Sequence, residues 1–111
     1  MDTSRLSCCV CDLGDAEIVP QLVEYNRLAN KSPMFDKAWV AHGYMDAAVK
    51  LMETWACSKL AQLPGATLEV VRLEGRTPLI YIDVPGQGDD TVMLYGHLDK
   101  QPEMTGWDEG L

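Results

Sequence analysis

The chain has 111 residues and is 47% hydrophobic, which suffices for one small folded domain or for part of a larger one. Its 17 acidic residues against 9 basic ones give a net charge of −8, which argues against nucleic acid or an anionic membrane as the main partner. No apolar run approaches the length that spans a bilayer, and the apolar patch near the N-terminus is too short for a secretory signal. We therefore expect a cytoplasmic protein.

Three cysteines cluster near the N-terminus, at Cys8, Cys9 and Cys11. Cys8 and Cys11 form a C-x-x-C motif, but no second pair or following histidine completes a zinc knuckle. A redox C-x-x-C lies between a strand and a helix, whereas this one precedes every predicted strand. Reduced thiols near the start of a helix are the simpler interpretation. The alternative is a short non-catalytic protein that binds a metal or a partner through this cluster.

Two amphipathic helices are expected in the first half of the chain. From residue 15 to about residue 30, apolar side chains recur every three or four positions, and Pro20 is tolerated because it lies in the first turns. Pro33 ends this pattern, since it disfavours helix at the residue before it. A second apolar stripe predicts a helix over residues 36–63. Its members are Ala41, Met45, Ala48, Met52 and Trp55.

The hydrophobic period changes from helix to strand after Gly65. The stretches ATLEVVRLEG (66–75) and PLIYIDVPG (78–86) predict two strands joined by a turn. TVMLYGHLD (91–99) predicts a third strand. Its near-continuous apolar run is typical of a strand buried on both faces of an α/β sheet.

The predicted elements make an incomplete layer structure. A buried strand needs neighbouring strands and a covering helix on each face, yet the turn-rich stretch after Gly96 offers no covering element. We therefore expect an α/β fold in which residues 1–14 form an N-terminal tail. Residues 15–111 would then be the N-terminal part of a larger α/β domain that is truncated at the C-terminus.

His97 and Asp99 stand at the end of the third predicted strand. Residues two apart on a strand point to the same face, and ligand sites in open α/β sheets lie beyond the carboxyl ends of the strands. A neutral imidazole is a good zinc ligand, and a nearby carboxylate can orient its ring. The alternative is a strand-end histidine that is simply bonded to Asp99. The spacing by itself does not separate these two interpretations.

The stretch YGHLDKQPEMTGWDEG resembles the co-catalytic, dinuclear zinc peptidases and amidohydrolases that include carnosinase, aminoacylase and glutamate carboxypeptidase. Their signature is an apolar strand, Gly-His-x-Asp, a short segment ending in proline, and a later tryptophan. Here these are residues 92–95, residues 96–99, Pro102 and Trp107. The DKQPE form is most similar to the dipeptidase branch. The resemblance extends from about Glu17 onward and leaves the cysteine cluster outside it.

The resemblance implies roles for two residues. His97 would be a ligand to one of two zinc ions, for which manganese or cobalt could substitute, and Asp99 would be the active-site residue that holds the imidazole. It also implies hydrolysis of peptide or other amide bonds by a metal-bound hydroxide, with dipeptides, peptides or N-acyl amino acids as substrates.

The implied fold is a three-layer α/β domain of the zinc-peptidase type. In this fold two helices, a β-hairpin and a buried strand lead to the His-x-Asp motif, and a homodimer would form through a domain absent from this chain. The remaining ligands and the general base would also lie outside it. Because a catalytic zinc ion takes about three protein ligands, we expect the chain on its own to be inactive.

Three further residues have plainer interpretations. His42 is expected on the surface of a helix without a ligand role, although Asp46 lies four positions after it. Lys100 could bind a substrate carboxylate, although a lysine next to an aspartate more often forms a local ion pair. Trp107 either shapes the rim of the site or anchors its loop.

Overall fold

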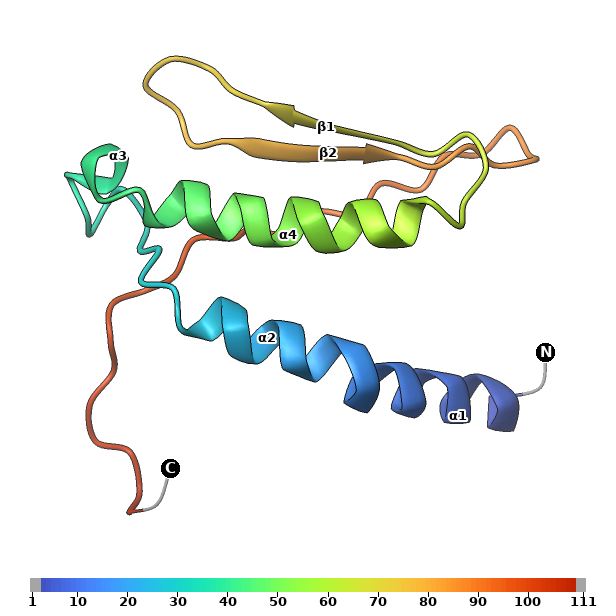
Figure 1. Ribbon diagram of the computed structural model, residues 1–111, viewed down its shortest axis with the longest axis horizontal. Helices are drawn as coiled ribbons and strands as arrows, with labels where there is room; N and C mark the ends of the chain where they lie inside the picture. Colours follow the sequence, from blue (N-terminus) through green and yellow to red (C-terminus); the bar gives the residue numbers. More distant parts are fainter. Residues whose placement is uncertain (1–2, 110–111) are drawn as a thin grey trace.

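The computed structural model describes residues 3–109 and combines helices with a small antiparallel sheet (Figure 1). A long helical run comes first, followed by a second helical region and a β-hairpin. Its elements in order are α1 (Thr3–Leu13), η1 (Gly14–Ile18), α2 (Val19–Asn26), α3 (Trp39–His42), α4 (Tyr44–Leu60), β1 (Thr67–Val71) and β2 (Leu79–Asp83). Figure 1 shows α4 lying between the hairpin and the α1–α2 run.

The first helical run begins at Thr3 rather than at residue 15, so part of the stretch expected as a tail is helical. Pro20 therefore lies inside a helical run, where it cannot donate the usual hydrogen bond to the carbonyl four residues earlier. The wider π-helical turn η1 comes immediately before it, and there the Val19 amide donates to the carbonyl of Gly14. Neither η1 nor α2 contributes a buried residue. An ion pair between Glu17 and Lys59 ties this run to α4.

The single helix predicted over residues 36–63 is divided into α3 and α4 at Gly43. Gly43 has a left-handed backbone conformation with φ of 70°, which ends α3. The buried apolar residues among those described all lie on α4, at Met45, Ala48 and Val49. Two of them belong to the predicted stripe, whereas Ala41, before the break, is exposed.

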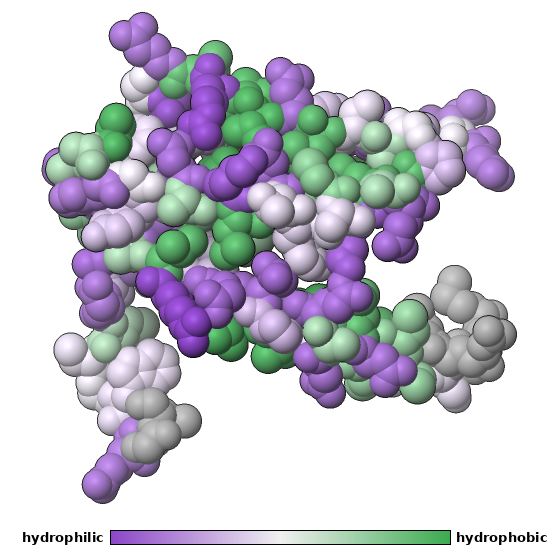
Figure 2. Space-filling view, in the orientation of Figure 1, coloured by the Kyte–Doolittle hydropathy of each residue, from purple (hydrophilic) through white to green (hydrophobic). Residues whose placement is uncertain are grey.

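The β-hairpin confirms the first two predicted strands. β1 and β2 pair antiparallel, with a register that runs from Thr67 opposite Asp83 to Val71 opposite Leu79. α4 packs against β1. Apolar side chains still reach the surface over this layer, as Figure 2 shows, and Leu79 and Tyr81 of β2 are exposed.

The predicted third strand over residues 91–99 is wrong for the structure described. These residues form no strand, and Val92, Met93, Leu94 and Tyr95 are 83–91% exposed. A strand buried on both faces requires neighbours to accept its backbone hydrogen bonds. Within residues 3–109, β1 and β2 pair only with each other. The motif that follows is placed by a different contact, a single parallel bridge between Lys31 and Lys100.

Candidate functional site

His97 and Asp99 contact each other at the end of the exposed segment. His97 Nδ1 lies 3.0 Å from Asp99 Oδ1 and 3.1 Å from the main-chain oxygen of Asp99. The His97 side chain is 71% exposed and that of Asp99 is 33% exposed. When Nδ1 donates its hydrogen to the carboxylate, Nε2 keeps a lone pair that can bind a metal ion. The two predicted site residues are therefore brought together in the arrangement that suits a histidine ligand.

The residue between them is held by α2 and the turn that follows it. The main-chain oxygen of Leu98 accepts hydrogen bonds from the Tyr25 hydroxyl at 2.5 Å and from Asn30 Nδ2 at 2.6 Å. Asn30 is only 1% exposed, and its Oδ1 has no hydrogen-bond partner within residues 3–109. A buried amide is costly unless its groups are paired. Because Asn30 is almost fully buried, its Nδ2 group would lose free energy without the hydrogen bond to Leu98 O, and this bond holds the Leu98 carbonyl in place.

Lys100 forms the second half of this attachment. Its main-chain N–H donates to Asn30 O and its main-chain oxygen accepts from the Ser32 N–H, both at 2.9 Å. Its ammonium donates to the carbonyls of Tyr25 at 2.6 Å and Leu28 at 2.7 Å. It also lies 4.1 Å from the centre of the Tyr25 ring. The ammonium thus bonds carbonyls at the C-terminal end of a helix, where the dipole favours a cation.

These contacts change the interpretation of Lys100. The predicted local ion pair is not what the structure shows, because the ammonium bonds main-chain carbonyls instead of a carboxylate. Partial burial lowers the pKa of Lys100 from its ordinary value. Sequence reasoning missed this role because the carbonyl partners lie more than 70 positions earlier in the chain. The only sequence signal is the position of Lys100 directly after the His-x-Asp motif.

Trp107 lies on the exposed stretch beyond the motif. Its indole Nε1 donates to the main-chain oxygen of Met104 at 3.0 Å, and the residue is 66% exposed. This contact holds the loop locally, as one of the two predicted roles requires. Nearer the motif, Glu103 pairs with Lys31 at 2.7 Å, and this hydrogen bond lowers the pKa of Glu103.

A second histidine–aspartate pair was not predicted. His42 Nδ1 lies 2.8 Å from Asp36 Oδ2, and this hydrogen bond is the main reason that the pKa of Asp36 is lowered. His42 is exposed, as expected, but it has an acidic partner six positions earlier. Spacing of four positions pointed to Asp46, which pairs with Arg72 instead, whereas Asp36 lies before α3 and outside helical spacing from His42.

The cysteine cluster lies on α1, and its thiols are exposed and unpaired with one another. Cys8 Sγ donates to Asp12 Oδ2 at 3.4 Å. Together with Cys9, Leu13, Ala16 and Glu17 these residues line a shallow hollow of about 560 Å³. The arrangement thus leaves the thiols accessible to a partner.

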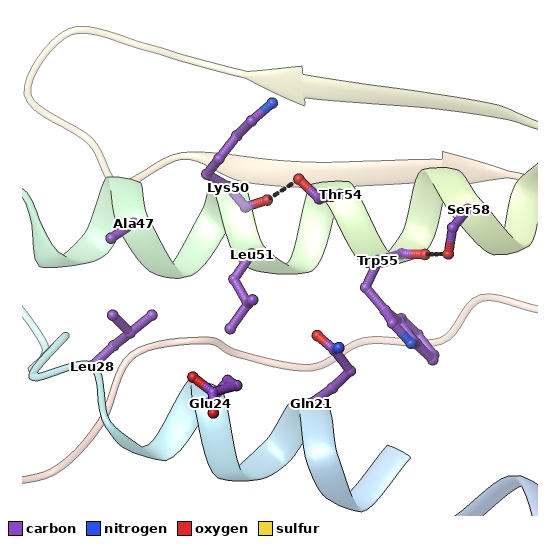
Figure 3. Close-up of a pocket in the computed structure, with 9 residues that line it drawn as sticks. All are labelled: Gln21, Glu24, Leu28, Ala47, Lys50, Leu51, Thr54, Trp55 and Ser58. Carbon is purple, nitrogen blue, oxygen red and sulfur yellow. Dashed lines mark hydrogen bonds between the residues drawn. The ribbon is translucent and has the colours of Figure 1, made fainter. Parts of the chain in front are cut away.

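A second hollow lies between α2 and α4 and is separate from the His97–Asp99 pair (Figure 3). Its volume is about 660 Å³, and it is lined by Gln21, Glu24, Leu28, Ala47, Lys50, Leu51, Thr54, Trp55 and Ser58. The hydroxyls of Thr54 and Ser58 donate to main-chain oxygens of their own helix, as the dashed lines in Figure 3 show. The predicted site residues therefore lie on the surface and do not open into this hollow.

The fit of these residues to a metal ion is partial. Across residues 3–109, no group of three or more histidine, cysteine, aspartate and glutamate side chains is arranged to hold a metal ion. His97 offers one ligand nitrogen and Asp99 the carboxylate that orients it. Because a catalytic zinc ion takes about three protein ligands, the pair is suited to be one part of a metal centre.

No protein-family model matches this chain, and no curated protein matches it. Within the described part of the chain, every helix is too short or too polar to cross a membrane.

Proposed function

We propose that this chain carries the first histidine ligand of a zinc-dependent dipeptidase or related amide hydrolase. In this proposal it belongs to a partial three-layer α/β catalytic domain, and the remaining ligands come from polypeptide outside its 111 residues. The observation that carries the proposal is the 3.0 Å contact between His97 Nδ1 and Asp99 Oδ1. The order of Gly96, His97, Asp99, Pro102 and Trp107, on which the resemblance to co-catalytic zinc peptidases rests, supports it.

The two residues have distinct roles in the proposed chemistry. His97 would bind the metal through Nε2, while Asp99 accepts the Nδ1–H, holds the plane of the ring and makes Nε2 a better donor. Zinc, manganese or cobalt would supply Lewis acidity and a water of lowered pKa. Dipeptides, peptides and N-acyl amino acids are the proposed substrates, because each presents an amide carbonyl for attack.

Zinc titration of the 111-residue chain, followed by NMR, tests where a metal binds. We expect weak binding that shifts the ring signals of His97 and is lost in His97→Ala. The control variant His42→Ala removes the other imidazole that is paired with an aspartate, at 2.8 Å, and should leave the His97 response intact. Tight binding that disappears in a Cys8→Ser/Cys11→Ser variant would instead support the alternative, a protein that binds metal or a partner through its exposed thiols.

Hydrolysis assays test the reaction itself. The isolated chain should not hydrolyse dipeptides or acylated amino acids with any of the three metals. In the complete product of its gene, His97→Ala should abolish the activity, and Asp99→Asn should reduce it about 10- to 100-fold, as for other partners of metal-bound histidines. His42→Ala should be neutral. Hydrolysis that is indifferent to both site substitutions would rule out the proposal.

A further inference from the structure

We infer that Tyr25, Asn30 and Lys100 are positioning residues that fix Asp99 against His97, so that the C-terminal end of α2 sets the tautomer of the His97 ring. The catalytic meaning of this inference rests on the proposed function. The arrangement itself rests on the hydrogen bonds that join residues 98–100 to residues 25–32. We call these bonds, together with the Lys100 ammonium contacts, the α2 dock.

The α2 dock holds the backbone on both sides of Asp99. Before it, the carbonyl of Leu98 accepts two hydrogen bonds, at 2.5 and 2.6 Å. After it, the N–H and C=O of Lys100 are both bonded, each at 2.9 Å. Because the peptide groups on both sides of Asp99 are hydrogen-bonded, the position of its backbone is restricted, and its side chain can reach His97 Nδ1. In a free peptide, the same contact would have to overcome the entropy of ordering both side chains.

The other side of the pair provides no comparable support. His97 follows a segment in which Val92 to Tyr95 are 83–91% exposed and which belongs to no strand. The imidazole is 71% exposed. Asp99 is thus the held member of the pair, and the ring of His97 is oriented by it.

The side chains that form the α2 dock are wholly or partly buried. Asn30 is buried, and its Nδ2 group donates a hydrogen bond to Leu98 O. Lys100 keeps its charge in a partly buried place, where carbonyls at a helix end and the face of the Tyr25 ring stabilise it. Such contacts are short-ranged and directional, which suits a device that orients a neighbouring residue.

The test measures the ring nitrogens of His97 by ¹⁵N NMR in the absence of metal, at a pH where the imidazole is neutral. We expect the Nδ1–H tautomer to dominate in the unsubstituted chain, because Nδ1 donates to Asp99. Lys100→Met keeps most of the length of the unbranched side chain and removes its donors. It should lower the ratio of the Nδ1–H to the Nε2–H tautomer by roughly fivefold, the change expected when the one hydrogen bond from His97 Nδ1 to Asp99 is lost.

Matched variants separate positioning from a general loss of structure. Lys100→Arg retains donors and should restore part of the tautomer ratio, and Lys50→Met makes the same substitution on the exposed surface of α4 and should change nothing. The ring of His42, which is paired with Asp36, serves as an internal reference. If Lys100→Met does not fold, Tyr25→Phe tests the same inference, since it removes one hydroxyl and keeps the ring.

The outcomes distinguish this inference from the proposed function. A tautomer ratio at His97 that is unchanged in Lys100→Met and Tyr25→Phe would overturn the inference, as would a parallel change at His42. The measurement contains no metal, so a chain that shows the expected change but whose complete gene product hydrolyses no amide would retain the inference and lose the proposed function.

Discussion

Replacing Lys100 with methionine should open the α2 dock locally while the rest of the fold stays closed. The substitution removes two hydrogen bonds, from the ammonium to Tyr25 O at 2.6 Å and to Leu28 O at 2.7 Å. Hydrogen bonds from charged groups contribute about 1.5–3 kcal/mol each. Because Lys100 is only partly buried, and methionine keeps the packing of the stem, we expect a combined loss of about 2 kcal/mol.

Native-state hydrogen exchange measures this loss at the right place. The Ser32 and Lys100 amides both bond across the dock, and their exchange reports its opening. A loss of about 2 kcal/mol corresponds to exchange that is faster by roughly thirtyfold. Amides of the β1–β2 ladder should keep their rates. In Lys50→Met, which disrupts only an exposed ion pair with Glu53, both sets should be unchanged.

Two results would refute this reasoning. Unchanged exchange at Ser32 and residue 100 in the Lys100→Met chain would mean that the ammonium contacts contribute nothing to the dock. An equal acceleration at the β1–β2 ladder would mean that Lys100 supports the whole fold instead of this one attachment.

The remaining predictions concern the rest of the fold. Val49→Ala removes two carbons from a side chain that is 1% exposed and should lower the free energy of unfolding by about 2 kcal/mol in urea titrations, whereas Val40→Ala on the exposed α3 should change it by under about 0.5 kcal/mol. Gly43→Ala places a Cβ at φ of 70° and should cost about 1 kcal/mol, seen as a lower midpoint of thermal unfolding by circular dichroism. The pKa of Asp36 is lowered by its hydrogen bond to His42, so the stability it contributes is present above its ordinary pKa of 3.8 and is lost as the pH falls through the lower folded-state pKa. Urea titrations at a series of acidic pH values should show a smaller loss in Asp36→Asn, and an identical pH dependence would contradict that role.

The parts of the fold that the sequence predicted are those that local chemistry determines. Alternating apolar residues and turn formers produced the hairpin as predicted, and apolar spacing identified the buried face of α4. Helix boundaries were less predictable, because Gly43 looked like an interior residue of one long helix although it takes a left-handed conformation. The third strand failed for a different reason, since an apolar run becomes a strand only when neighbours pair with it.

The site shows the same division between local and distant contacts. His97 and Asp99, two residues apart, were predicted as a pair, and their side chains are in contact. The α2 dock was not predicted, because it joins Lys100 to groups about 70 positions earlier and uses main-chain carbonyls that no side-chain pattern reveals. Asn30 gave no signal either, since its partners Leu98 and Lys100 lie near the far end of the chain.

The residues before His97 and those after Asp99 differ in how they are held, and this difference shows how a metal ligand can be oriented without a buried strand. The apolar residues before His97 are exposed, so hydrophobic burial contributes little to holding it in place. The polar contacts after it fix Asp99 through groups that belong to α2 and its turn. These contacts thereby position the Asp99 carboxylate. The imidazole of His97 orients to it while remaining exposed enough to bind a metal ion. Changes at the end of α2 should therefore reach His97 through Asp99, although none of the α2 residues would touch the metal.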